Sequence, residues 1–419
     1  MQKLEIKGGR KISGTIEISG SKNATLPILA STILTEKEVL VTNIPIVKDV
    51  ETMADLLRSI GSNVKLNKKT KKIKILNKKP LKTFAPYHLL KTMRAGVLIL
   101  GSLLSKYKVA RVSLPGGCAI GLRPINFHLN ALKKMGAKIK IKNGYIIASS
   151  KKGLKGCLIK FPKISVGATE NLIIASSMAE GTTILSNCAI EPEIKDLVNF
   201  INCMGGKIKW IGKRTLKIQG VNNLKEAKYT IMPDRIEAGT YLIAAAVTEG
   251  NLKISGINPN IIRTEIEILK KIGAKIKSEK NHIRVIGIKD IKSINLKTSP
   301  YPGFPTDLQA QLMVLLCKSK KHSVISEEIF ENRFMHVAEL RRLGAKITIK
   351  DNKATIEGGN NFQGAELMSS DLRASVALVL AAIVANGQSI INRIYHLDRG
   401  YEKIETKLSN CGAQIRRLK

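Results

Sequence analysis

The sequence predicts an α/β protein built from six copies of one folding module, and two observations carry this prediction. First, a helical pattern runs into a glycine and then into a strand six times along the 419 residues. The glycines lie 75, 69, 68, 71 and 68 residues apart, at Gly61, Gly136, Gly205, Gly273, Gly344 and Gly412. A helix that passes the chain directly to a strand needs a residue that tolerates positive φ, and glycine does so. Second, each repeat contains an earlier helical stretch that is rich in small apolar residues.

These small-residue helices begin at polar or charged segments, which lie at 21–23, 91–94, 165–167, 233–235, 305–307 and 370–373. We expect Arg94 to lie inside its helix, which makes that start the least regular. Most of these helices end in a turn signal and a β-branched strand, as at 179–187 (AEGTTILSN) and 385–392 (ANGQSIIN). Each repeat therefore predicts a strand, a small-residue helix, a strand, a second helix, a glycine and a two-stranded hairpin, which is a βαβαββ module.

Six modules of about 70 residues predict two domains of three modules each. The first domain covers residues 22–232. Met232, Pro233 and Asp234 interrupt the pattern, and the second domain begins there and covers 233–419 together with 1–21. Residues 1–21 predict a strand and a turn that complete no module of the first half, so we expect them to pair with the last module.

The net charge of +38 comes from 70 Lys and Arg against 32 Asp and Glu. Such a charge favours nucleic-acid binders, and an RNA-binding α/β repeat protein is the alternative from another functional class. The lysines are scattered over every repeat, however, and aromatic residues make up only 4%, which is sparse for a surface that stacks bases. We therefore expect a solvated basic surface and no nucleic-acid partner. The sequence carries no signal of its own for the oligomeric state, and a monomer is the expectation.

The longest apolar stretches, 95–104 and 374–385, are shorter than the roughly 20 residues of a membrane span. The first residues lack the apolar core of a secretory signal, so we expect a cytoplasmic protein without membrane insertion. The six cysteines form no CxxC pair and the histidines have no metal-ligand spacing. We expect reduced thiols, five of them in the core, and no metal. No GxxxxGK[ST] loop and no GxGxxG helix start is present.

The segment 113–124 (SLPGGCAIGLRP) has the composition of an exposed, mobile loop, which is typical of a lid. Its Cys118 lies five residues before Arg123, and a nearby cation favours a reactive thiol that acts as a proton donor or a nucleophile. The alternative is a glycine-rich loop with an incidental thiol.

Cations recur at the helix starts and in nearby loops. Helix N-termini present N–H groups and a positive dipole, so converging cations there would form an anion pocket. The alternative for each cation alone is a surface charge. The cations are Lys22, Arg94, Arg235 and Arg373 at helix starts, with Arg123, Arg333 and Arg399 in loops. Asp307 and Asp371 begin helices, where Asp usually caps the N-terminus, but beside cations either carboxylate can act as a general base.

Several long motifs, in order, resemble the UDP-N-acetylglucosamine 1-carboxyvinyltransferases, a family of enolpyruvyl transferases. They are SGSKNATLPIL (19–29), KTMRA (91–95), SLPGGCAIGLRP (113–124), SVGATE (165–170), EPEIKD (191–196), PDRIEAGT (233–240), FPTDLQAQ (304–311), ENRFMH (331–336), DLRAS (371–375) and RIYHLDRGYE (393–402). The sister family, which acts on 3-phosphoshikimate, shares fold and chemistry and is the enzymatic alternative.

The resemblance implies two inside-out α/β barrel domains around a central cleft that closes on the sugar nucleotide. It also implies transfer of the enolpyruvyl group of phosphoenolpyruvate to the 3′-hydroxyl of UDP-N-acetylglucosamine, with release of phosphate. Cys118 would protonate the methylene carbon of phosphoenolpyruvate, would hold a covalent adduct, and would be the thiol that fosfomycin alkylates. Asp307 would accept the hydroxyl proton.

The remaining site residues are also implied by the resemblance. The anionic groups of phosphoenolpyruvate would be neutralised by Lys22, Arg123 and Arg399. The site would be shaped, and the domains coupled, by Asn23, Arg94, Arg333, Asp371 and Arg373. The uridine and diphosphate would contact Pro124, Ile125, Asn126, Phe127, Lys163, Ile164, Ser165, Val166, Gly167 and Ile329. Family members often have Asp where this chain has Asn126, which keeps an acceptor oxygen but loses a charge.

Overall fold

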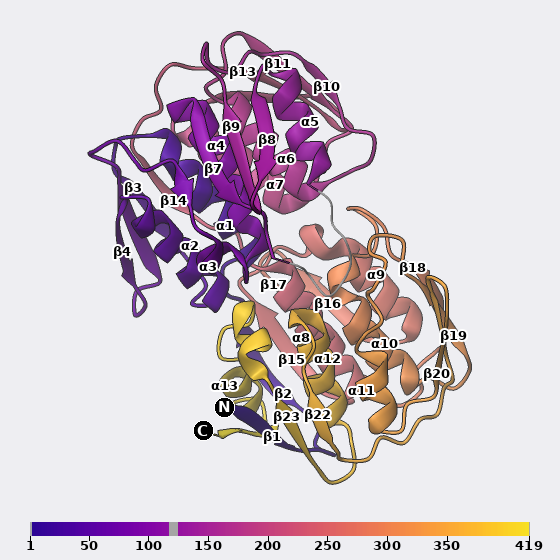
Figure 1. Cartoon of the computed structure of the whole chain (residues 1–419). Coiled ribbons are helices and arrows are strands. Elements are labelled where there is room, and N and C mark those ends of the chain that lie inside the picture. Colours follow the sequence, from indigo (N-terminus) through magenta and orange to yellow (C-terminus); the bar gives the residue numbers. More distant parts are fainter. Residues whose placement is uncertain (1, 117–124, 419) are drawn as a thin grey trace. The chain divides into compact units, whose positions relative to one another are not determined.

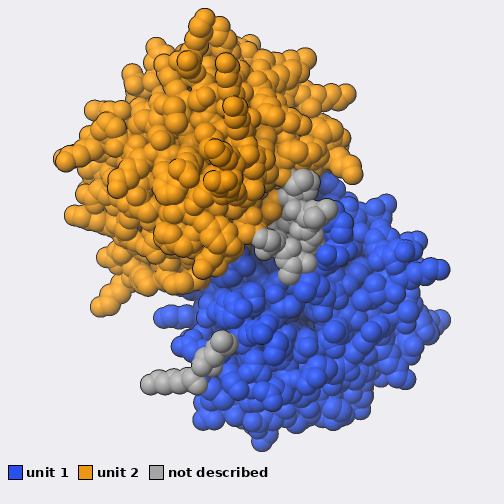
Figure 2. All heavy atoms as spheres, viewed as in Figure 1, with its two compact units in different colours: residues 1–19, 119–122, 233–419 blue, residues 20–118, 123–232 orange. Residues whose placement is uncertain are grey.

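The computed structural model describes residues 2–116 and 125–418, which form two compact units (Figure 2). Unit 2 contains residues 20–116 and 125–232, and unit 1 contains residues 2–19 and 233–418. Each unit has its own apolar core and holds three four-stranded sheets (Figure 1). The predicted α/β fold with six repeats is confirmed.

Unit 2 contains the sheets β14-β3-β5-β4, β6-β7-β9-β8 and β10-β11-β13-β12. Its strands are β3 (Val39–Thr42), β4 (Asn63–Asn67), β5 (Lys72–Leu76), β6 (Phe84–Ala85), β7 (Val109–Ser113), β8 (Lys138–Lys142), β9 (Tyr145–Ser149), β10 (Leu158–Lys160), β11 (Thr182–Ser186), β12 (Lys207–Gly212), β13 (Thr215–Gln219) and β14 (Ala227–Thr230). Its helices are α1 (Lys22–Ser31), α2 (Lys48–Ser59), α3 (Tyr87–Leu90), α4 (Ile99–Tyr107), α5 (Asn126–Lys134), α6 (Val166–Ser176) and α7 (Pro192–Cys203), with 3₁₀ turns η1 (Thr32–Leu34) and η2 (Arg94–Leu98).

Unit 1 contains the sheets β16-β17-β15-β2, β18-β19-β21-β20 and β22-β23-β1-β24. Its strands are β1 (Lys3–Lys7), β2 (Ser13–Glu17), β15 (Asn251–Ser255), β16 (Lys275–Glu279), β17 (His282–Ile286), β18 (Asn295–Lys297), β19 (Ser323–Ser326), β20 (Ile347–Lys350), β21 (Lys353–Ile356), β22 (Glu366–Met368), β23 (Gln388–Asn392) and β24 (Gln414–Leu418). Its helices are α8 (Arg235–Val247), α9 (Arg263–Ile272), α10 (Gln309–Cys317), α11 (Val337–Arg342), α12 (Leu372–Ile383) and α13 (Ile404–Ser409), with 3₁₀ turns η3 (Pro259–Ile262), η4 (Thr306–Leu308) and η5 (Ile394–Arg399).

Five of the six sheets repeat one pattern, in which two parallel strands are followed by an antiparallel hairpin. In the sheet of β10, for example, β10 runs parallel to β11, and β11 pairs antiparallel with β13 of the β12–β13 hairpin. In the sixth, β22-β23-β1-β24, the antiparallel pair of β1 and β24 takes the place of the hairpin. The six glycines that end the second helices all have positive φ, between 93° and 119°. This is the backbone conformation that the repeated motif predicted, and a strand begins two or three residues after each glycine.

The N-terminal strands complete two modules of unit 1. Strand β1 pairs antiparallel with β23 and β24, as predicted, with Leu4 opposite Ile391 and Arg417. Strand β2 pairs parallel with β15, which the sequence did not predict. In unit 2 the corresponding first strand is β14, which lies parallel to β3 although almost 190 residues separate Thr42 from Thr230.

The small-residue helices lie at the centre of each unit, and the sheets lie outside them (Figure 1). All nine residues of α10 and all twelve of α12 are buried. A helix that is apolar on every side is stable only when it is surrounded, and α10 packs against α8 and α12 within unit 1. In unit 2, α4 packs against α6, and both contact α1.

Two local predictions are wrong. Arg94 is the first residue of the 3₁₀ helix η2, which runs directly into α4 at Ile99, so Arg94 lies at the start of the helical segment and not inside it. Of the five cysteines expected in the core, Cys157 is only half-buried in the loop before β10, and Cys203 is exposed at the end of amphipathic helix α7. In the described ranges, no helix is both long and apolar enough to cross a bilayer.

Candidate active site

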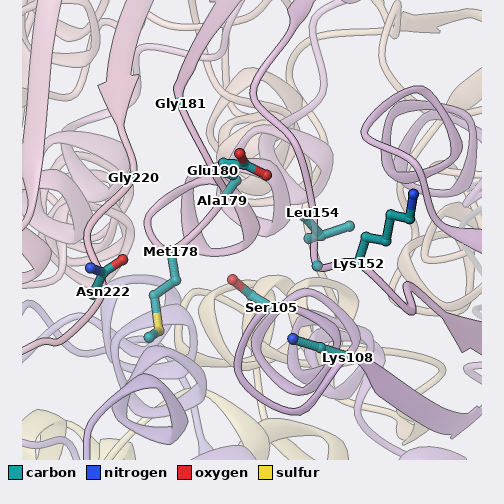
Figure 3. A pocket seen from close by; sticks show the side chains of 11 residues that line it. Ser105, Lys108, Lys152, Leu154, Met178, Ala179, Glu180, Gly181, Gly220 and Asn222 are labelled. Atoms are coloured by element: carbon teal, nitrogen blue, oxygen red, sulfur yellow. The ribbon is translucent and has the colours of Figure 1, made fainter.

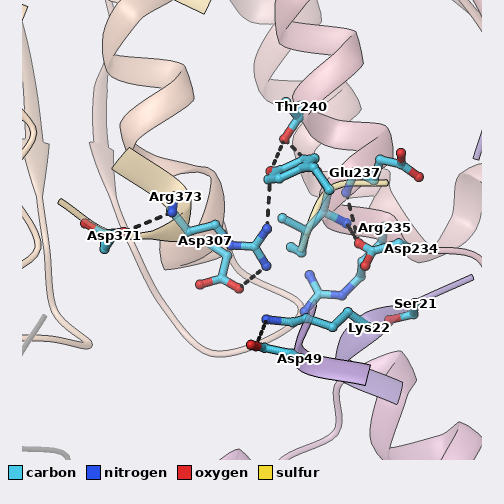
Figure 4. Close-up of polar contacts among 12 residues, drawn as sticks. Ser21, Lys22, Asp49, Asp234, Arg235, Glu237, Thr240, Asp307, Asp371 and Arg373 are labelled. Carbon is cyan, nitrogen blue, oxygen red and sulfur yellow. Dashed lines mark hydrogen bonds and ion pairs between the residues drawn. The ribbon is translucent and has the colours of Figure 1, made fainter. Parts of the chain in front are cut away.

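The carboxylate of Asp307 in unit 1 is held by two buried arginines. It lies on η4, just before α10, and its Oδ1 accepts from Arg333 Nη2 at 2.9 Å. Its Oδ2 accepts from Arg373 Nη2 at 2.8 Å (Figure 4). The arginine side chains are only 4% and 6% exposed, whereas that of Asp307 is 27% exposed. The carboxylate is thus oriented by fixed charges and still reaches solvent, as a general base must.

Arg373 also belongs to a buried hydrogen-bond network centred on the hydroxyl of Tyr401. Arg373 Nη1 donates to the hydroxyl of Tyr401 at 3.2 Å, and that hydroxyl lies 2.8 Å from Thr240 Oγ1. Gln311 Nε2 donates to the same hydroxyl at 3.3 Å and to the backbone oxygen of Asp307 at 3.1 Å. Burial opposes the charge of Arg373, but the ion pair with Asp307 outweighs it and raises the pKa of Arg373. Arg373 therefore stays a cation in a dry setting.

Asp371 has the ordinary capping role. Its Oδ1 accepts from the backbone N–H groups of Arg373 and Ala374 at 2.9 and 3.1 Å, at the start of α12. The capping alternative is thus confirmed for Asp371 and wrong for Asp307, whose carboxylate caps no helix among the described residues. Nearby His336 is buried, and burial lowers its pKa to about 4, while Asp371 opposes and Arg333 assists that shift.

Two further predicted residues of unit 1 lie in short segments whose neighbours make fixed contacts, Arg399 at the end of a 3₁₀ helix and Ile329 in a loop. Arg399 is half-buried at the end of η5, and its neighbour Asp398 accepts two bonds from Arg417, at 2.9 and 2.7 Å. Ile329 is half-buried, and its N–H donates to the buried carboxylate of Glu327 at 2.9 Å.

In unit 2, Lys22 is the first residue of α1, and Ser21 caps that helix by accepting from Ala24 N. The ammonium group of Lys22 lies 3.4 Å from Asp49 Oδ2 on α2 (Figure 4), and both side chains are about nine-tenths buried, at 11% and 6% exposure. A lysine held at a helix N-terminus adds its charge to the free N–H groups, which favours an anionic ligand. Asn23, the next residue, is half-buried.

The residues predicted to contact the nucleotide lie at the starts of two packed helices of unit 2. Ile125, Asn126 and Phe127 lie at the start of α5, and 163–167 lead into α6, which Ser165 caps. The helices α5 and α6 pack together. A Cβ on Gly167 would lie 3.4 Å from the ring of His128, so the start of α6 lies against this ring. Lys163, Asn126 and Val166 are exposed, whereas Ile164, Ser165 and Phe127 are half-buried.

His128 is buried behind these helix starts. Its Nδ1 lies 2.9 Å from the Asn171 amide nitrogen, which makes Nδ1 the acceptor and places the ring proton on Nε2. Burial, assisted by the charge of Arg94, lowers the pKa of His128 to about 3. Burial is therefore the main reason that this ring stays neutral, and the charge of the half-buried Arg94 adds to it.

Cys118, Arg123 and Pro124 lie outside the described residues. In the part of the chain that the structure describes, no group of three His, Cys, Asp or Glu side chains could hold a metal ion.

Sequence reasoning missed the partners of the charged residues. Asp49 is the missed partner of Lys22, and Tyr401 is the missed partner of Arg373. Gln311 in turn donates to Tyr401, and Glu327 accepts from the N–H of Ile329. One signal was available, because Gln309 and Gln311 are polar residues in the otherwise apolar helix α10, and a buried polar side chain usually has a partner.

An open pocket of about 290 Å³ in unit 2 is lined at its base by Ser105, Met178 and Ala179, close to the C-terminal ends of α4 and α6 (Figure 3). None of the predicted site residues lines it. The predicted cations of unit 2 stand at helix starts, so this pocket carries no part of the candidate site.

The family model of EPSP synthase (3-phosphoshikimate 1-carboxyvinyltransferase) matches residues 6–408. A UDP-N-acetylglucosamine 1-carboxyvinyltransferase from Pelagibacter ubique is 66% identical over 418 residues, covering 100% of both chains. The enzyme of the same name from Trichlorobacter lovleyi is 50% identical, covering 100% of this chain and 99% of the relative.

Among solved structures, the enolpyruvyl transferase NikO from Streptomyces tendae has a TM-score of 0.92 at 22% identity, covering 100% of this chain and 99% of that one. EPSP synthase from Acinetobacter baumannii has a TM-score of 0.77 at 19% identity, covering both chains fully. At these identities the likeness shows the fold alone.

Proposed function

The chain belongs to the EPSP synthase family of carboxyvinyltransferases, and we propose that it transfers the enolpyruvyl group of phosphoenolpyruvate to the 3′-hydroxyl of UDP-N-acetylglucosamine, releasing phosphate. The observation that carries the proposal is the 66% identity, from end to end, to an enzyme with this acceptor in its name. The reaction is the first committed step of peptidoglycan synthesis and therefore serves cell wall biogenesis, cell shape and cell division.

The reaction proceeds by addition and elimination. Asp307 accepts the proton of the 3′-hydroxyl, whose oxygen bonds to the central carbon of phosphoenolpyruvate, while Cys118 donates a proton to the methylene carbon. The intermediate then loses that carbon's added proton and the phosphate, which restores the double bond. The charge that develops on the phosphate and carboxylate is neutralised by Lys22, Arg123 and Arg399, and such prearranged charges are usually the largest catalytic contribution.

Of the two candidate aspartates, Asp307 is the better placed to act as the base, because its side chain is partly exposed and oriented by two arginines. Arg333 and Arg373 leave its carboxylate partly exposed, whereas the Asp371 carboxylate already accepts two backbone N–H groups. Asp371 therefore shapes the site through α12, and Arg373 orients Asp307. The nucleotide contacts Ile329, residues 124–127 and residues 163–167, while Asn23 and Arg94 shape the site and couple the domains.

We further propose that residues 22–232 and residues 1–21 with 233–419 act as two three-module domains of a cytoplasmic monomer. Cys118 forms the covalent adduct and is the thiol that fosfomycin alkylates. The proposal includes no metal, cofactor or nucleic-acid partner.

Phosphate release by the purified chain tests the function. We expect release only when phosphoenolpyruvate and UDP-N-acetylglucosamine are both present. Replacing the sugar nucleotide with 3-phosphoshikimate should abolish the release. If phosphoenolpyruvate reacted with 3-phosphoshikimate and not with the sugar nucleotide, the chain would instead have the activity of the sister family. Salt-sensitive RNA binding without a response to UDP-N-acetylglucosamine would contradict the proposal altogether.

A further inference from the structure

We propose that Glu327 is a positioning residue that joins the turn carrying Asp307 to the loop carrying Ile329 and Arg333 in unit 1. The inference rests on the proposed function, because it assigns Glu327 a part in that reaction. Glu327 follows strand β19 and is only 3% exposed. It belongs to none of the motif positions that the sequence marked as site residues.

The Glu327 carboxylate accepts four hydrogen bonds. Oε1 accepts from Thr298 Oγ1 at 3.0 Å, and from the N–H groups of Ile329 and Phe330 at 2.9 and 3.2 Å. Oε2 accepts from Thr306 Oγ1 at 2.9 Å. A buried carboxylate is stable only when donors satisfy its lone pairs, and four donors do so here.

The positions of these donors point to a role in the reaction. Thr306 directly precedes Asp307, the proposed base, on η4. Ile329 and Phe330 begin the segment that reaches Arg333, whose guanidinium binds Asp307 at 2.9 Å. The Glu327 carboxylate is therefore bonded close to both members of the Arg333–Asp307 ion pair. Thr306 is adjacent to Asp307, and Glu327 itself lies six residues before Arg333. Bonds to an ionised acceptor are roughly twice as strong as neutral ones, so this carboxylate fixes the geometry firmly.

The two oxygens make separable contributions. The bonds to Oε1 hold the segment of Ile329, a proposed nucleotide contact, whereas the bond to Oε2 holds the Asp307 turn. Loss of the whole carboxylate should therefore weaken both nucleotide binding and turnover. Loss of the Thr306 bond alone should affect turnover and leave nucleotide binding nearly unchanged.

Steady-state kinetics on the full-length chain test this inference with three variants. For Glu327→Ala, we expect the KM for UDP-N-acetylglucosamine to rise about tenfold or more and kcat to fall about tenfold, because charged hydrogen bonds are lost. The KM for phosphoenolpyruvate should stay within about twofold, because none of the residues proposed to bind it contacts Glu327 among the described contacts. Glu327→Gln should keep kcat and the KM for the nucleotide close to the wild-type values, since its amide oxygen can replace Oε1. Thr306→Val should lower kcat by about threefold to tenfold without changing the KM for the nucleotide.

Glu328→Ala is the matched control, because Glu328 is the adjacent carboxylate and lies at the surface, where it pairs with Lys297 at 3.4 Å. It should behave as the wild type. If Glu327→Ala proves unfolded in thermal melts, Glu327→Gln and Thr306→Val decide the question. Wild-type nucleotide KM in Glu327→Ala, or wild-type kcat in Thr306→Val, would overturn the inference alone. A rise in both KM values by the same factor would also overturn it, because it would show a merely structural role. A wild-type chain without the transfer activity would instead overturn the proposed function, and this inference with it.

Discussion

At the scale of single residues, the hydrogen-bond donors around Asp307 and Asp371 give these two aspartates different roles. Asp371 and Asp307 both lie at the start of a central helix, yet only Asp307 faces two guanidinium groups. The Oδ1 atom of Asp371 instead accepts from two backbone N–H groups at the start of α12. The sequence position of an aspartate therefore does not decide its role, because that role depends on which donors the fold brings to its oxygens.

Cys118 provides the sharpest test of a single residue in the proposed reaction. Cys118→Ala should lose most activity, by about 10²-fold or more, since it removes the proton donor. Cys118→Asp should retain turnover and resist fosfomycin, because a carboxyl group delivers a proton without being alkylated as readily as a thiol. Phosphate release with and without fosfomycin measures both effects, and full turnover by Cys118→Ala near neutral pH would show that the proton comes from elsewhere.

The hydroxyl of Tyr401 should stabilise unit 1 and orient Arg373. Tyr401→Phe leaves Arg373, Thr240 and Gln311 without a shared buried partner, so we expect the free energy of unfolding to fall by about 1–3 kcal/mol. Turnover should fall as well, because Arg373 holds Asp307. Denaturant unfolding and kcat measure the two effects. The control is Tyr395→Phe, whose ring is 50% exposed, and an equal loss of stability in both variants would contradict this account.

At the scale of secondary-structure elements, the glycine turn between the second helix and the following strand recurs in every module of this chain. Gly136 illustrates its backbone requirement, with φ of 98° and open space around the position of a Cβ. Its substitution therefore isolates conformational strain from steric overlap. Other repeat glycines are less suitable, since a Cβ on Gly273 would lie 2.3 Å from the Ile288 side chain.

Gly136→Ala should lower the free energy of unfolding by about 1–2 kcal/mol, because an L-residue is strained at positive φ. Gly212→Ala is the control, since Gly212 is exposed on β12, does not have positive φ, and would place its Cβ 3.6 Å from Thr215. It should change stability by less than about 0.5 kcal/mol. Thermal or denaturant unfolding of both variants decides, and equal stabilities would show that the backbone relaxes at Gly136.

At the scale of the whole molecule, each unit buries a histidine that the fold keeps neutral. Burial lowers the pKa of His128 in unit 2 to about 3 and of His336 in unit 1 to about 4. Below a pH of about 6.5 the unfolded chain binds protons at both residues that the folded chain does not bind. The free energy of unfolding should therefore fall as the pH is lowered from about 6.5 towards 4.

One carboxylate works in the opposite direction. Burial raises the pKa of Asp196 to about 6, although its bonds from Tyr229 and the Met232 N–H oppose this shift. Between about pH 6 and 4 the folded chain therefore holds a proton that the unfolded chain releases, which offsets one histidine. The net dependence of these three groups is about one proton, or about 1.4 kcal/mol per pH unit.

Unfolding measured between about pH 7 and 5 tests this dependence. His128→Gln should flatten the slope by about one proton, because it removes one of the two buried groups. The exposed His322 provides the control, and His322→Gln should keep the wild-type slope. A slope unchanged in His128→Gln would show that another group carries the acid sensitivity.

The sequence by itself determined the repeated module, the positive φ at the six repeat glycines and most helix starts. Each of these depends on local periodicity or on the φ that one residue tolerates. Only the tertiary structure decided that β14 and β2 supply the missing parallel strands, and that Asp307 meets Arg373 across 66 residues while Tyr401 meets Thr240 across 161. Those contacts join segments with no local signal for each other. They form when three buried helices pack and bring their starts to one end of the unit, so residue types and spacing indicated the charges but not their partners.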